Sequence, residues 1–130
     1  YISGEHKTWP ACVEVQGHYK RLAQIFAMGG AKGPRSDGDE AARKKARKPH
    51  TEWNKFEINF AAPRFDAKGN KIQNAKLLEV VLNGEIIHQG VEMEEQTFGG
   101  PYAKEGPVGA LYLQGDHGPV AYRNIRVLDM

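Results

Sequence analysis

The chain has 130 residues, of which 40% are hydrophobic and 26% charged, and its formal net charge is +2. These values are typical of one globular domain, which we expect to span residues 1–130, and they argue against a disordered tail. The near balance of 18 basic and 16 acidic residues points to no special partner. The single Cys12 excludes an internal disulfide, and no apolar run approaches the ~20 residues of a membrane span.

Most of the predicted elements are short strands. Residues 12–16 and 53–60 alternate between apolar and polar side chains, with Glu14 and Gln16 on one face of the first strand. Residues 76–82 and 85–89 predict a hairpin around Asn83-Gly84, because both turn residues tolerate a positive φ. Residues 109–113 and 120–128 predict a second hairpin. Many short strands at this spacing indicate an all-β sandwich or barrel.

Three segments depart from this pattern. Residues 19–28 fit a short helix or a strand, and residues 62–70 predict a loop with a tight Gly-Asn turn. Residues 33–48 form a polar, basic insertion, with a short helix at residues 40–47. A phosphate or nucleic-acid surface is one interpretation of its charge. Because no aromatic residues interleave with the basic ones, we favour a solvated insertion.

Hydrogen-bonding and titratable groups crowd the turn of the second predicted hairpin. The geometry of a turn requires Gly, Pro and Asp but does not require Gln, His and Arg. His117 lies in a turn flanked by glycines, where the freedom of the backbone allows its side chain to be directed toward a ligand. We therefore place a candidate site here, formed by Gln114, Asp116, His117, Arg123 and Asn124.

Other reactive residue types have simpler interpretations. Alternation alone favours a solvent-facing position for Glu14 and Gln16, although a concave sheet would turn them into a groove. Cys12 fits a small packed residue better than a nucleophile, and His88 fits a packed or half-exposed strand position. No two histidines have the spacing of a helical zinc motif. Five aromatic residues could stack on sugar rings, although most of them are expected in the core: Trp9, Trp53, Tyr102, Tyr112 and Tyr122.

The C-terminal motif also carries a family resemblance. Residues 113–125 read Leu-Gln-Gly-Asp-His-Gly-Pro-Val-Ala-Tyr-Arg-Asn-Ile. This stretch resembles the closing signature of the 3-keto-disaccharide hydrolase domain family. Further matching stretches follow the family's order over most of the chain: residues 1–4, 13–16, 52–57, 62–70 and 81–88.

The resemblance implies a concanavalin-like jelly-roll β-sandwich of two antiparallel sheets, with the site on the concave sheet and the basic insertion around residues 33–48 added to it. The resemblance implies that Glu14 and Gln16 line the groove of this concave sheet. It also implies that Gln114, His117 and Arg123 form the other wall of the groove. Family members have further strands ahead of the segment that matches Tyr1. We therefore expect this chain to be the larger C-terminal part of the family domain, with a missing segment or a partner chain completing the sheets.

The implied activity is cleavage of a 3-keto-glycoside. The ketone acidifies the proton on C2, a base removes it, the C1 substituent leaves by β-elimination, and water adds. His117 or Glu14 is the expected base, and Arg123 or Gln114 the expected donor to the enolate oxygen. Gln16 and Asp116 complete the expected substrate contacts. Direct hydrolysis needs two carboxylates flanking the bond, and Glu14 is the only good candidate for that role.

The alternative is a non-catalytic carbohydrate-binding module with the same groove. We expect a carbohydrate ligand, no nucleic acid and no membrane. No cofactor is predicted, and a divalent cation is left open. By resemblance, we expect a secreted or periplasmic bacterial protein.

Overall fold

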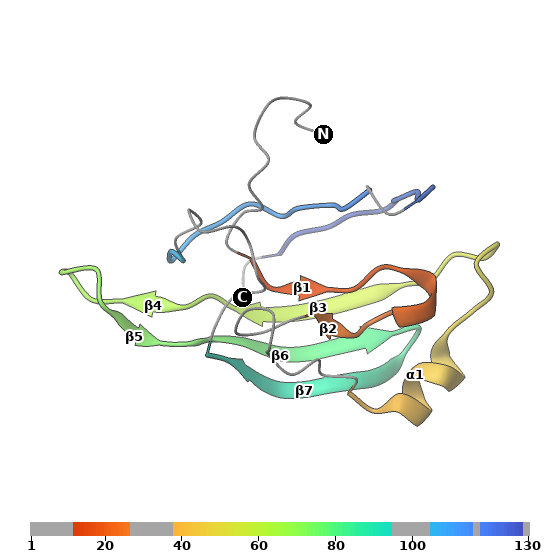
Figure 1. Cartoon of the computed structure of the whole chain (residues 1–130), viewed down its shortest axis with the longest axis horizontal. Helices are drawn as coiled ribbons and strands as arrows, with labels where there is room; N and C mark the ends of the chain where they lie inside the picture. The colour runs from red at the N-terminus through yellow and green to blue at the C-terminus, as the bar shows by residue number, and fades with distance from the viewer. Residues whose placement is uncertain (1–11, 27–37, 95–104, 116–117, 129–130) are drawn as a thin grey trace.

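The computed structural model describes residues 12–26, 38–94, 105–115 and 118–128. All strand pairs in these residues are antiparallel, which confirms the all-β prediction; the jelly-roll connectivity stays a prediction. Figure 1 shows the strands β1 (Glu14–Val15), β2 (Ile25–Phe26), β3 (Phe56–Ala61), β4 (Arg64–Phe65), β5 (Lys71–Gln73), β6 (Ala75–Leu82) and β7 (Glu85–Met93) with one short α-helix, α1 (Glu40–Ala46).

The main sheet has the strand order β3-β6-β7. Its hairpin β6–β7 turns at Asn83 and Gly84, whose φ angles of 51° and 90° are those of the predicted tight turn. This hairpin is confirmed, and β7 continues beyond the predicted end to Met93. The two register shifts in this sheet fall between Asn59 and Phe60 and between Val80 and Val81.

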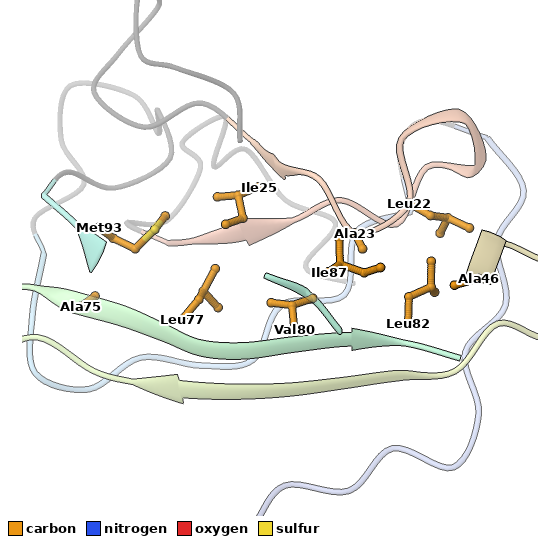
Figure 2. Close-up of a cluster of buried hydrophobic side chains, with 10 residues drawn as sticks. All are labelled: Leu22, Ala23, Ile25, Ala46, Ala75, Leu77, Val80, Leu82, Ile87 and Met93. Carbon is orange, nitrogen blue, oxygen red and sulfur yellow. The ribbon is translucent and has the colours of Figure 1, made fainter. Parts of the chain in front are cut away.

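The hydrophobic core lies between the main sheet and the short β1–β2 hairpin. Ile25 of β2 faces Leu77 and Val80 of β6 (Figure 2), and all three are almost fully buried. Burying a side chain of this size contributes about 1.5–3 kcal/mol. Residues 19–26, for which helix and strand were both open, contain one of each: the 3-10 helix η1 (Tyr19–Arg21) and β2.

The β3 strand is the edge of the main sheet in the described strand order. Ile58 pairs with Val80, so the two side chains share the face that looks toward the core. Ile58 is nevertheless 45% exposed and Phe60 42% exposed, so this part of β3 is covered less completely than β6. Glu57 and Asn59 lie on the opposite, solvated face, as their alternation predicts.

The helix α1 forms where the sequence predicts it. The side chain of Asp39 caps its first turn by accepting a hydrogen bond from the Ala42 amide. Arg43 and Ala46 are buried, and α1 packs against β7. The predicted short helix is confirmed, and most of its residues are exposed as a solvated insertion predicts. Ala42 and Ala46 nevertheless give it an apolar side that packs against the core. No helix in the described part of the chain is long and apolar enough to cross a membrane.

The predicted loop at residues 62–70 contains part of a small hairpin. Its strands β4 and β5 are antiparallel, and the turn between them is organised by Asp66. The carboxylate of Asp66 accepts hydrogen bonds from the amides of Lys68 and Asn70 and from the Asn70 side chain. These hydrogen bonds stabilise the turn, since the strands on either side of it are short.

The predicted hairpin at residues 109–113 and 120–128 is not formed. Residues 105–115 and 118–128 run as extended chain without strand pairing, on the β3 side of the molecule (Figure 1). Asn124 has a φ of 55°, which interrupts the alternation on which the prediction depends. Tyr112, Tyr122 and Trp53 are about half exposed, so the prediction that most aromatic residues are core is wrong for these three; Trp9 and Tyr102 lie outside the described residues.

Candidate functional site

The face of β1 that points away from the core carries Glu14 and Gln16. Val15 between them packs against the core, opposite Ile25, so alternation turns the two polar side chains to the other side. Gln16 is only 6% exposed, and Glu14 is half-buried. The solvent-facing interpretation is therefore wrong for Gln16.

Hydrogen bonds fix the orientation of the Gln16 side chain. Its Oε1 accepts from the amide of His18 at 2.8 Å, and its Nε2 donates to Oε1 of Glu14 at 2.8 Å. Because the amide oxygen is committed to a backbone donor, the amide nitrogen must face the carboxylate. The result is a carboxylate that is half-buried and oriented by a neighbouring amide.

Cys12 extends this face by one more alternate position. Burial raises the pKa of its thiol, and the negative charge of Glu14 raises it further. The Glu14 carboxylate is therefore close enough to act on Cys12 electrostatically. A thiol held protonated is a poor nucleophile, which fits the interpretation of Cys12 as a packed residue.

Part of the C-terminal segment reaches the same region. The Tyr122 hydroxyl donates to the Gln114 carbonyl at 2.6 Å. The same hydroxyl lies 4.0 Å from the point where a Cβ on Gly17 would sit, and burial raises the pKa of Tyr122. The structure thus brings Gln114 and Tyr122 to the residue that follows Gln16. The sequence suggests Tyr122 only as a core residue or a sugar-stacking ring, because no local signal predicts a contact with residue 17.

Arg123 stacks on an aromatic side chain. Its guanidinium carbon lies 3.9 Å from the centre of the Trp53 ring, a cation–π contact with the residue that shortly precedes β3. Arg123 is therefore held at the β3 end of the molecule by an aromatic platform, a partner that strand alternation could not predict. Asp116 and His117 lie outside the described residues.

The described histidines have other partners. His18 accepts from the Lys20 amide through Nδ1 and caps η1. His50 packs edge-on against Tyr19, with ring centres 5.5 Å apart. His88 is buried and lies 2.7 Å from the Ala23 carbonyl through Nε2. Among the described residues, no three His, Cys, Asp or Glu side chains gather as ligands for a metal ion.

Comparison with known families decides the classification. The sequence profile of the 3-keto-alpha-glucoside-1,2-lyase-like domain matches residues 2–128. The chain belongs to this family. The match covers almost the whole chain and agrees with the resemblance seen in its motifs. No curated protein and no solved structure matches the chain.

Proposed function

We propose that this member of the 3-keto-alpha-glucoside-1,2-lyase-like family cleaves 3-keto-glycosides by elimination followed by hydration. A base takes the C2 proton, and the electrons of the C–H bond delocalise onto the C3 carbonyl oxygen as an enolate. The enolate collapses to form the C1–C2 double bond as the C1–oxygen bond breaks. The leaving oxygen takes a proton from an acid. Water then adds across the double bond, so that the overall change equals hydrolysis and no oxidant is consumed.

One observation assigns this chemistry to particular residues. The Glu14 carboxylate accepts a hydrogen bond from Nε2 of Gln16 at 2.8 Å. General-base catalysis needs a basic side chain, here a carboxylate, placed within hydrogen-bonding reach of the proton that it removes. The Gln16 amide restricts Glu14, and the burial of Gln16 keeps the pair partly away from water. An ordered carboxylate of this kind avoids part of the entropy cost of reaching the reactive geometry.

The remaining roles belong to the C-terminal segment. We propose His117 as the proton donor to the leaving oxygen, or as the base with Glu14 in support. Gln114 and Arg123 are proposed to donate hydrogen bonds to the enolate oxygen, where negative charge develops. Gln114 has the stronger support of the two, because its backbone is tied to Tyr122 beside Gly17.

The test is product formation from a 3-keto-glucoside by the wild-type chain and three variants. Glu14→Gln removes the base but keeps the size and a polar end group, and His117→Ala removes the imidazole. Glu57→Gln is the matched control, because Glu57 is an exposed strand carboxylate on β3. We expect a loss of about 10²-fold or more in kcat for the first two variants and no change for the control, with all folds intact by circular dichroism.

Other results would change the proposed function or the identity of the base. Saturable binding of plain oligosaccharides without turnover would support a non-catalytic carbohydrate-binding module. Equal turnover in Glu14→Gln and Glu57→Gln would exclude Glu14 as the base. The secreted or periplasmic location stays a prediction.

A further inference from the structure

His88 is a buried polar residue to which the proposed chemistry gives no role. It lies on β7 and is only 3% exposed. Its Nε2 is 2.7 Å from the carbonyl oxygen of Ala23, 65 residues away in the sequence. A carbonyl oxygen only accepts hydrogen bonds, so Nε2 carries the proton and donates it. This bond offsets part of the cost of burying the imidazole.

The acceptor of this hydrogen bond is an unusual residue. Ala23 is fully buried and has a φ of 62°, a left-handed conformation that costs a non-glycine residue about 1–2 kcal/mol. Such a conformation persists where the surroundings hold it in place. The amide of Ala23 donates to the Gln16 carbonyl at 2.9 Å, while its own carbonyl accepts from His88. Both the amide and the carbonyl of Ala23 are thus held by hydrogen bonds.

Gln16 is connected directly to this turn. Its amide donates to the Gln24 carbonyl at 2.8 Å, and its carbonyl accepts from Ala23. Its side chain in turn holds Glu14. A continuous path of hydrogen bonds therefore runs from His88 through Ala23 to Gln16 and Glu14.

The other side of the His88 ring is closed by backbone. Gly38 has a φ of 64°, and a Cβ at this position would lie 2.5 Å from Cε1 and 2.8 Å from Nδ1 of His88. The next amide, that of Asp39, donates to the Ile87 carbonyl at 2.9 Å. The loop before α1 is thus attached to β7 beside the ring, and its backbone packs against the Nδ1–Cε1 edge of the imidazole.

We propose that His88 is a positioning residue for the Glu14–Gln16 pair. Its ring packs against Gly38, its Nε2 donates a hydrogen bond to the Ala23 carbonyl, and this bond fixes the backbone that carries Gln16. The catalytic part of this inference rests on the proposed function. A residue that only fills the core would affect the free energy of unfolding alone. A positioning residue also affects the order of the Gln16 side chain and the value of kcat.

Two substitutions at His88 separate these roles. His88→Phe keeps a ring of similar size but removes the donor, and His88→Gln keeps an N–H at a similar reach. Gly38→Ala places a methyl group against the Nδ1–Cε1 edge of the ring and against the Ile87 carbonyl. The first measurement is the exchange rate and chemical shift of the Gln16 side-chain amide by NMR, which needs no substrate. The second is kcat and KM with a 3-keto-glucoside.

We expect His88→Phe and Gly38→Ala to speed exchange of the Gln16 side-chain amide and to lower kcat about tenfold with little change in KM, since small misplacements of catalytic groups reduce rates this strongly. His88→Gln should return both readouts toward wild type. If His88→Phe lowers only the melting temperature, or if His88→Gln rescues nothing, the proposal is wrong. If the wild-type chain has no turnover, the proposed function fails, and the Gln16 amide alone decides whether His88 positions the pair.

Discussion

The β6–β7 hairpin and the C-terminal segment, residues 105–115 and 118–128, have similar sequence patterns and different structures. Both combine alternating apolar residues with a turn of Gly and Asn or Asp. The first forms the centre and one side of the main sheet, and Leu77, Val80 and Leu82 are buried in the core. In the second, Leu111 is 64% exposed and Leu128 81% exposed.

The difference shows what alternation leaves unspecified. Strand β6 has β3 on one side and β7 on the other, which satisfies its backbone hydrogen bonds. Its apolar face packs against Ile25 of β2. The described C-terminal residues have no ladder partner, and the positive φ of Asn124 shifts the residues after it. An apolar pattern therefore predicts a strand only where a neighbouring strand and a facing layer exist.

The largest expected difference between the two regions lies in a pair of leucines. Leu77→Ala should lower the free energy of unfolding by about 2–5 kcal/mol, because it leaves a cavity under β2. Leu111→Ala, the matched change in the exposed segment, should stay within about 0.5 kcal/mol of wild type. Urea denaturation with an unchanged m-value measures both. Equal losses would mean that the C-terminal segment packs as tightly as β6.

Two glycines sharpen the same comparison. Gly84 has a φ of 90° and no atom within 4 Å of an added Cβ, so Gly84→Ala should cost about 1–2 kcal/mol from backbone strain alone. Gly109 has equal space and no positive φ. Gly109→Ala should be neutral or stabilise by about 0.4–1 kcal/mol. Thermal unfolding monitored by circular dichroism distinguishes them, and a neutral Gly84→Ala would contradict the tight turn.

The β4–β5 turn offers a test by pH. Hydrogen bonds from the side chain and backbone of Asn70 lower the pKa of Asp66 below its ordinary value of 3.8. The turn's stabilisation should therefore be present above that value and be lost as the pH falls through the lower, folded pKa. An NMR titration of the Asp66 carboxyl measures the midpoint, and Asp66→Asn should abolish the matching shift of the Asn70 amide. A midpoint above 3.8 would contradict this turn.

The smallest expected effect concerns Cys12, which reports on the β1 face. Its alkylation by iodoacetamide should follow a thiol pKa above the ordinary 9.0, because burial and the charge of Glu14 both raise it. Glu14→Gln should lower this pKa only in part, since burial is the larger cause. The single cysteine makes the pH dependence of alkylation simple to assign. An unchanged pKa in Glu14→Gln would place the carboxylate away from Cys12.

The sequence predicts the elements whose determinants are local. Asn83-Gly84 and the alternation of β3 and β6 specify a sheet, and the short helix predicted at residues 40–47 forms as α1. The sequence does not predict that Arg123 meets Trp53 or that His88 meets Ala23, because these contacts join residues 70 and 65 positions apart. The Glu14–Gln16 pair was found because its two residues share one strand face.

The most direct test of the account follows the hydrogen on C2 of the substrate. Cleavage of a 3-keto-glucoside labelled with deuterium at C2 should release the label to water, because elimination removes it before hydration adds a solvent proton. The wild-type chain and Glu57→Gln should show this loss, Glu14→Gln should not, and incubation without protein corrects for spontaneous exchange. Cleavage that retains deuterium at C2 would contradict the account, because direct hydrolysis breaks only the bond at C1.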